Sequence, residues 1–454
     1  MTHAELLRVA GRLEEFLERC FEGMGRLERR RALKEYIRGL MLDGERKSME
    51  PMASRLAGDL GRTQAIRQRM QQAVTVARWD EGVLYERLAR RMAATCGIDA
   101  LVIDDTGFPK QGRHSVGVQR QYSGTLGRTG NCQVATSLHV ASEMGGGCIG
   151  MRLYLPKAWT DAPERRAKAG VPDDIVFEEK WRLALGLLDR ALSWGLEPRP
   201  VLTDSAYGDS TEFRAGLEER QFRYIVGVTP TAVVWPPGTC PTPPPPRPAH
   251  VRGRTFKRWS APKGVKPVSM LAVAQSIDAA QYRRVSWRNG NRDKRTGRFA
   301  AVRIRTARRN TEGRAPGPEQ WLLCEWPRGA DKPTKCHLSN LPAATSLRRL
   351  VYLAKLRWRV ERDYQEMKGE LGLDHYEGRG WVGFHHHMAC VSAAHAFLTL
   401  DRALSPPVQT KSHLAAVPSR PSAGSLDHAR ALPHVRQNYF SEVTPSDPIT
   451  DVIK

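Results

Sequence analysis

The change in hydrophobic period at residue 99 constrains the fold of this chain more than any other feature. Before it, apolar side chains recur at three- and four-residue steps from residue 4 to about 97, which predicts helices. After it, residues 100–103 form a continuous apolar run that predicts a short buried strand, and Asp104 and Asp105 follow. An unpaired carboxylate is costly to bury, so the two acids need a reason to be there. A turn at Thr106 and Gly107 would be a structural reason, and a polar site would be a functional one.

Short strands and helices then alternate as far as residue 229. A glycine-rich turn joins the first two of these strands as an antiparallel hairpin, and a later strand ends in Asp204. The segment 107–130 is punctuated by glycine and contains Lys110 and Arg113, which predicts a basic loop. The alternation predicts an α/β fold with a mixed sheet. The predicted strands are 132–141, 148–155, 200–203 and 223–228, and the predicted helices are 177–194 and 211–219.

A basic, β-rich segment interrupts this pattern between about residues 230 and 337. Its twelve Lys or Arg residues between positions 283 and 314 stand against two acids. Such an excess favours contact between nucleic acid and residues such as Arg295, Arg298 and Arg303, over the alternative of a solubilising surface. Strands are predicted at 268–274, 282–287, 299–306 and 321–326, and the proline-rich stretch 235–248 is predicted to be irregular.

The whole chain is strongly basic. Lys and Arg number 71 against 48 Asp and Glu, a formal net charge of +23 that indicates a polyanionic partner. Nucleic acid fits best, with an anionic membrane surface as the alternative, and no apolar run reaches the roughly 18 residues that span a bilayer. The eight cysteines include no CxxC pair and the first residues do not resemble a signal peptide, so we expect a cytoplasmic protein. The basic helical region before residue 97 predicts a DNA-end-binding domain or, equally, an ordinary helical bundle.

A long helix is predicted from about residue 346 to residue 371. On a helical wheel its Arg357, Glu361 and Lys368 form one polar stripe, beside an apolar stripe that can dock on a core. The functional interpretation is a carboxylate held between two cations, as a metal ligand aimed at a phosphate. The alternative is a surface helix with spaced charges. A last helix is predicted at 385–400, and its histidines 385–387 do not predict a zinc site, because neighbours on a helix face different ways.

Three carboxylates from distant parts of the chain suit a metal site. Adjacent strands of one sheet can bring Asp105 and Asp204 together, and the long helix can lay Glu361 beside them. Such a trio suits two divalent ions about 3.5–4 Å apart. Mg²⁺ prefers few carboxylates together with water and phosphate oxygens. Arg357 and Lys368 would then neutralise phosphate on either side.

These residues resemble the DDE transposases of bacterial insertion sequences. The resemblance implies a ribonuclease H-like mixed sheet with helices, preceded by a helical N-terminal domain and interrupted by a β-rich insertion. It covers about residues 30–400, and the segments 104–110 and 372–379 belong to it as well. The matching residues are Asp105-Thr106, Asp204, Arg357, Glu361 and Lys368.

The resemblance also assigns one of the two neighbouring acids. In such families the acid directly before threonine is the metal ligand, which implies Asp105, whereas Asp104 should face the other side of the strand. The tyrosine position of the family signature holds Ala354 here.

The activity that the resemblance implies is cut-and-paste transposition with two Mg²⁺ ions, for which Mn²⁺ is a substitute. The protein would bind terminal inverted repeats, cleave the DNA and join its 3′ ends to target DNA, as a homodimer in a nucleoid-associated synaptic complex. Lys110 and Arg113 are further expected DNA contacts.

The rival interpretations are a catalytically inactive, sequence-specific DNA-binding protein of the same fold and a metal-dependent nuclease without strand transfer. The expected domains are a helical DNA-binding domain (1–97), two parts of a catalytic core (98–229 and 338–403), the insertion (230–337) and a disordered tail (404–454).

Overall fold

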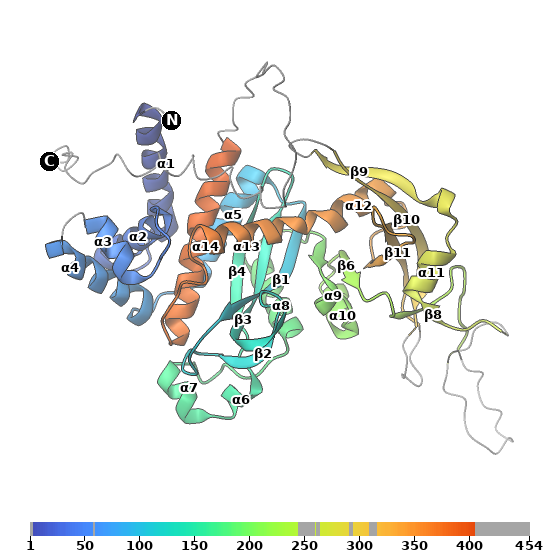
Figure 1. Ribbon diagram of the computed structural model, residues 1–454, viewed down its shortest axis with the longest axis horizontal. Helices are drawn as coiled ribbons and strands as arrows, with labels where there is room; N and C mark the ends of the chain where they lie inside the picture. Colours follow the sequence, from blue (N-terminus) through green and yellow to red (C-terminus); the bar gives the residue numbers. More distant parts are fainter. Residues whose placement is uncertain are drawn as a thin grey trace, which may run out of the picture.

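A computed structural model describes residues 3–57, 60–243, 259, 264–289, 294–307 and 316–404. The helices of residues 3–71 lie at one end of the molecule, a long sheet crosses its middle, and the strands of the basic segment lie at the other end (Figure 1). None of the helices in these ranges combines the length and the apolar character that crossing a bilayer requires. The predicted tail after residue 404 lies outside the described residues.

The N-terminal region is helical, as predicted. The side chain of Asp80 begins its last helix by accepting from the backbone N of Gly82 at 2.8 Å, and Gly97, with φ of 69°, ends that helix. The region packs around the final helix α14 (Trp381–Leu404), where the ring centroids of Phe16 and Phe397 lie 5.5 Å apart. Its elements are α1 (His3–Phe21), α2 (Leu27–Met41), α3 (Met49–Ala57), α4 (Leu60–Gln71), the π-helical turn Gln72–Val76 and α5 (Glu81–Cys96).

The central sheet is mixed. Strand β1 pairs antiparallel with β3 and parallel with β5, and β6 is parallel to β5. With β4 on the far side of β3, this arrangement confirms the predicted ribonuclease H-like fold. The strands are β1 (Ala100–Pro109), β2 (Gln119–Ser123), β3 (Arg128–Ala141), β4 (Gly146–Leu153), β5 (Val201–Thr203) and β6 (Tyr224–Val228).

Helices bury both faces of this sheet. Leu101 and Ile103 of β1 belong to one core, and Ala100 and Val102 belong to another, because successive side chains of a strand point to opposite faces. The helices of the first core include α8 (Lys180–Ser193), α9 (Ser205–Gly208) and α10 (Thr211–Glu219), which the short helices α6 (Lys157–Thr160) and α7 (Pro163–Ala169) precede. The second core lies against α12 (Leu347–Leu356) and α13 (Trp358–Gly369).

The β-rich segment extends the central sheet. Its last strand pairs antiparallel with β6, so the sheet runs on in the order β6-β12-β11-β10-β7-β8, with β9 on β10. The strands are β7 (Val233–Trp235), β8 (Val268–Ser269), β9 (Arg283–Asn289), β10 (Lys294–Thr306), β11 (Glu319–Trp326) and β12 (Lys335–Ser339). Trp235 ends β7, and residues 236–243 of the predicted irregular stretch 235–248 are turn and irregular structure apart from an isolated bridge at Thr242. Residues 244–248 lie outside the described residues.

Two predicted segments differ in the structure. The strand predicted at 268–274 is mostly the helix α11 (Met270–Ser276), because the Ser269 side chain caps it by accepting from the backbone N of Ala272 at 3.1 Å. The loop predicted at 107–130 contains the end of β1 and all of β2. Both strands pair with the first part of β3, which begins earlier than predicted.

Arg357 interrupts the helix that was predicted to run from 346 to 371. Helix α12 ends at Leu356 and α13 begins at Trp358. Between them the backbone N of Val360 donates to the carbonyl of Arg357 at 3.1 Å, a tighter i to i+3 turn. Arg357 therefore lies at the start of α13, beside β1.

Candidate functional site

Two aspartates lie level with each other on the neighbouring parallel strands β1 and β5. Leu101 pairs with Val201 in this register, and continuing it by three residues sets Asp104 opposite Asp204. Residues in register on parallel strands point to the same face, and the Asp204 carboxylate is close enough to act on the charge of Asp104. Oδ1 of Asp204 also accepts from the backbone N of Ala206 at 3.0 Å and so begins α9.

Helix α13 carries Glu361, which Arg357 links to Asp104 on this face. Nη1 of Arg357 donates to Oδ2 of Asp104 at 2.9 Å, and its Nη2 donates to Oε1 of Glu361 at 2.5 Å. The Tyr364 hydroxyl of the same helix lies 2.5 Å from Oγ of Ser137, the residue opposite Asp104 on β3. One guanidinium therefore bridges an acid of the strand and an acid of the helix. The Glu361 side chain is 60% exposed, so the site opens to solvent on this side.

The electrostatics of the site suit a bound cation. Burial raises the pKa of Asp104 to about 6; the Arg357 guanidinium opposes this shift and the Asp204 carboxylate adds to it. Carboxylate oxygens are the hard donors that Mg²⁺ takes, and a cation among these acids would relieve their repulsion. As the side chains stand, no three His, Cys, Asp or Glu residues in the described ranges enclose a metal position. Arg357 supplies the positive charge between Asp104 and Glu361.

Asp105 points to the opposite face of β1. Its Oδ2 accepts from Nζ of Lys180 at 2.8 Å, and its Oδ1 accepts from Oγ1 of Thr136 at 3.1 Å and from the Tyr207 hydroxyl. These partners come from α8, β3 and α9, whereas Asp104 faces α13. The sequence predicted that Asp105 would lie with Asp204 and Glu361, but in the structure it faces away from them. Asp104 lies on the face of Asp204 and is linked to Glu361 through Arg357. The sequence signal was the acidic pair itself, which does not reveal which acid faces the helix.

The three predicted basic contacts near β1 have different surroundings. Nζ of Lys368 donates to the carbonyl of Gly107 and to Oγ1 of Thr125, both at 3.0 Å, so it lies farther along β1 than the acids. Nζ of Lys110 donates to the carbonyl of Tyr376 at 2.7 Å. Arg113 is exposed.

The predicted arginines of the β-rich segment also differ in their contacts. Cζ of Arg298 lies 4.1 Å from the ring centroid of Trp326. Nη2 of Arg303 donates to the carbonyl of Glu319 at 2.7 Å. Arg295 is exposed. Their contacts with DNA stay predictions, and Arg295 is the one with the freest side chain.

A buried polar network behind the site was not predicted. Nδ1 of His139 lies 2.7 Å from Oδ2 of Asp363, and its Nε2 lies 3.0 Å from Oγ of Ser137. Oγ of Ser137 in turn donates to the carbonyl of Asp104 at 3.3 Å. The chain of contacts thus ties α13, which carries Glu361, to the backbone of β1 at Asp104. Its members come from β1, β3 and α13, and no local sequence pattern links these three elements.

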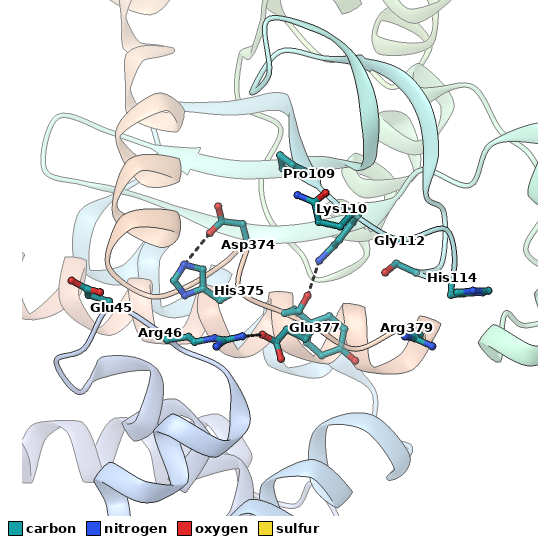
Figure 2. A pocket seen from close by; sticks show the side chains of 13 residues that line it. Glu45, Arg46, Pro109, Lys110, Gly112, His114, Asp374, His375, Glu377 and Arg379 are labelled. Carbon is teal, nitrogen blue, oxygen red and sulfur yellow. Dashed lines mark hydrogen bonds and ion pairs between the residues drawn. The ribbon is translucent and has the colours of Figure 1, made fainter.

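A cavity of about 510 Å³ lies near the far end of β1 (Figure 2). The loop before α3 contributes Arg46, whose Nη2 pairs with Oε1 of Glu377 at 2.8 Å, and Nε2 of His375 lies 3.8 Å from Oδ1 of Asp374. Lys110 enters from the end of β1 (Figure 2). The lining carries both signs of charge.

Comparisons with known proteins bear on the first two acids. A family described as "DDE superfamily endonuclease" matches residues 19–294, a span that contains Asp104 and Asp204 but ends before Glu361. A protein of Microchaete diplosiphon described as "Probable transposase for insertion sequence element IS701" is 34% identical over 129 residues. That alignment covers 28% of this chain and 31% of the relative, so the chain matches less than a third of the relative's length.

Proposed function

Because this chain belongs to the DDE superfamily of endonucleases, we propose that it is a DNA transposase of an insertion sequence. It would bind the terminal inverted repeats, cleave the DNA at the ends of the element and join those ends to target DNA. The similarity to a protein described as a probable transposase supports this choice over other DNA-cleaving enzymes. The net charge of +23 supports a polyanionic substrate.

The observation that carries the proposal is the arrangement of three acids around one arginine. Asp104 and Asp204 lie level on β1 and β5, and Arg357 links Asp104 to Glu361 of α13. We assign the catalytic role to these three acids, with Asp104 in place of Asp105, which the resemblance to the family implied.

Members of this superfamily generally depend on a divalent metal ion. The site would hold Mg²⁺, with Mn²⁺ as a substitute, through the carboxylates of Asp104, Asp204 and Glu361. When bound, the ions would lower the pKa of the attacking water or 3′-hydroxyl and stabilise charge on the leaving oxygen. The exposed side chain of Glu361 is free to turn from Arg357 toward such an ion.

The basic residues of the site would position the DNA backbone. Arg357, released from the acids, presents five N–H donors in the fork geometry that suits a phosphate. Lys368 is held by hydrogen bonds to Gly107 of β1 and to Thr125 of the turn after β2, so it presents its charge from a fixed place. Positioning by these residues lowers the entropic part of the barrier to phosphoryl transfer.

Joining two ends of an element requires two copies of the site in one assembly. We propose a homodimer that holds both ends in a synaptic complex, with the basic N-terminal helices as a surface for end recognition. The exposed Arg26 and Arg31, at the start of α2, carry charge that suits such a surface.

The test is a cleavage and joining assay with the full-length protein. The substrate is duplex DNA that carries the sequences flanking the gene, incubated with Mg²⁺ or with Mn²⁺ and analysed on denaturing gels. We expect Asp104→Asn, Asp204→Asn and Glu361→Gln each to slow cleavage by about 100-fold or more while leaving DNA binding intact. Asp105→Asn, the matched control on the same strand, should stay within about tenfold of the wild type.

Each outcome separates the competing interpretations. Loss of cleavage in Asp105→Asn with normal cleavage in Asp104→Asn would return the ligand role to Asp105. Cleavage without joined products would identify a nuclease. Binding of the flanking sequences with no cleavage in either metal would identify a catalytically inactive DNA-binding protein.

A further inference from the structure

An arginine–tryptophan stack joins the β-rich segment to the helix that carries Glu361. Cζ of Arg288, on β9, lies 3.8 Å from the ring centroid of Trp358, the first residue of α13. Cζ of Arg359 lies 4.6 Å from the same centroid. The ring is half-buried and directly follows Arg357 in the chain. The stack therefore lies beside the proposed catalytic acids, at the seam between two parts of the molecule.

Further positive charges gather around this stack. Arg288 lies directly opposite Arg295 in the antiparallel register of β9 and β10. Burial lowers the pKa of the Arg288 guanidinium, and the charges of Arg295 and Arg362 lower it further. Within the described ranges, neither Arg288 nor Arg295 pairs with a carboxylate. Arg362 has one acidic partner, Glu366, at 2.6 Å.

Like charges placed directly opposite each other on paired strands destabilise a sheet. The Trp358 ring offsets part of this cost, because a guanidinium over an aromatic face is attracted to the ring. Stacking also orients the group: a guanidinium lying on a ring keeps its N–H donors at its edges, where an anion can reach them. The arrangement is thus costly when empty and suited to an anion with several oxygens.

We propose that Arg288, stacked on Trp358, and its neighbours Arg295 and Arg362 form a binding site for the phosphate backbone of DNA. The choice of DNA as the anion rests on the proposed function. Arg362 directly follows Glu361, and Trp358 precedes that acid by less than one helical turn, so a strand bound here would pass the catalytic acids. Guanidiniums cover the ring of Trp358, so it supports the arginines and does not stack on a base.

The site differs in part from the one that the sequence predicted for this segment. Arg298 and Arg303 each donate to a backbone carbonyl, whereas Arg295 is retained and Arg288, stacked on Trp358, is added. The sequence did not distinguish Arg288 from the other arginines of this segment, because its partner Trp358 lies 70 positions later along the chain.

The test is the salt dependence of DNA binding by the full-length protein in EDTA, where metal-dependent cleavage does not occur. One probe is a duplex with the sequences flanking the gene, and the other is an unrelated duplex of equal length. We expect Arg288→Gln and Arg295→Gln each to weaken binding about five- to tenfold and to reduce the slope of log K against log[KCl] by about 1. Arg283→Gln, which removes an exposed charge at the start of the same strand, is the matched control and should leave the slope unchanged.

The pattern across the probes identifies the source of the phosphates. A loss confined to the flanking sequences indicates the element end, a loss confined to the unrelated duplex indicates target DNA, and an equal loss indicates both. Unchanged slopes in both arginine variants would overturn the proposal. So would a Trp358→Leu variant that binds more weakly than Arg288→Gln with a wild-type slope, because that result indicates base stacking.

Two features keep this test independent of folding and of the catalytic proposal. Arg295 is exposed, so Arg295→Gln carries the test even if Arg288→Gln fails to fold. If the acid variants abolish cleavage but the arginine variants bind like the wild type, the result contradicts the phosphate site and leaves the proposed function intact. If the arginine variants behave as expected but no metal supports cleavage, the result contradicts the proposed function and leaves the phosphate site intact.

Discussion

A step of one residue along β1 gives two neighbouring acids different surroundings. Asp104 faces Arg357 and the acids of the proposed site, whereas Asp105 accepts hydrogen bonds from Lys180, Thr136 and Tyr207. The alternation of side chains on a strand requires this separation. We therefore propose that Asp105 ties β1 to the helices behind it.

This role predicts a loss of stability at Asp105. We expect Asp105→Ala to lower the free energy of unfolding by about 2–3 kcal/mol, because the buried Tyr207 and Thr136 hydroxyls lose the carboxylate that accepts from them. Asp105→Asn keeps one acceptor oxygen and should lose less. Urea denaturation measures both changes. An alanine variant as stable as the wild type would show that these contacts contribute little.

At the scale of elements, α13 is held by buried polar contacts as well as by apolar packing. Asp363 contacts His139 of β3, and Glu366 accepts from Nη2 of Arg402 on α14 at 2.6 Å. Both acids are buried. The helix that carries Glu361 is thus fixed on two sides, against the sheet and against the last helix. A proposed catalytic acid needs such support, because its position controls the reaction.

We therefore expect His139→Ala to destabilise the protein by about 3–5 kcal/mol, since it leaves the Asp363 carboxylate buried without its main partner. Cleavage by the remaining folded protein should also slow, because α13 loses a contact that sets its position. Denaturation curves and single-turnover cleavage rates measure the two effects. The double variant His139→Ala with Asp363→Ala serves as the control and should cost less than the sum of the single changes. Strictly additive losses would argue against direct coupling.

At the scale of the whole molecule, α14 joins parts that are distant in the sequence. Nδ1 of His387 lies 2.8 Å from the Tyr36 hydroxyl of α2, and its Nε2 lies 3.1 Å from the carbonyl of Gly372. The backbone N of Leu153 donates to Nε2 of His385 at 3.3 Å. These histidines thus connect the N-terminal helices, the sheet and the loop after α13.

Their burial predicts that acid destabilises the protein. Burial lowers the pKa of His387 from 6.5 to about 4, and that of His385 to about 4 as well. Between those values the unfolded chain binds protons that the folded protein excludes, so the free energy of unfolding falls as the pH falls. We expect His387 alone to contribute about 2 kcal/mol of this loss between about pH 7 and about pH 5.

Urea denaturation at about pH 7 and about pH 5 measures this effect. His387→Gln should be less stable at both pH values but should show a weaker pH dependence. His114→Gln, which changes an exposed histidine, is the matched control and should retain the pH dependence of the wild type. Equal stability of the wild type at the two pH values would contradict the prediction.

The sequence by itself determined the elements and the chemistry that they can carry. Hydrophobic period separated the N-terminal helices from the sheet, and strand ends and a polar stripe pointed to Asp204, Glu361 and Arg357. Local pattern also had limits: it predicted a strand at 268–274, where the Ser269 cap starts a helix, and it did not show the break at Arg357. These errors arose where a cap or a tight turn outweighed the period of apolar residues.

Only the tertiary structure decided which side chains meet. The register between β1 and β5 set Asp104, and not Asp105, opposite Asp204, since a shift of one residue exchanges the two faces of a strand. The pairing of β6 with β12 joined the β-rich segment to the central sheet, and the meeting of β9 with α13 placed Arg288 on Trp358. Period and composition describe one segment at a time, whereas register and packing are relations between segments that lie far apart in the chain.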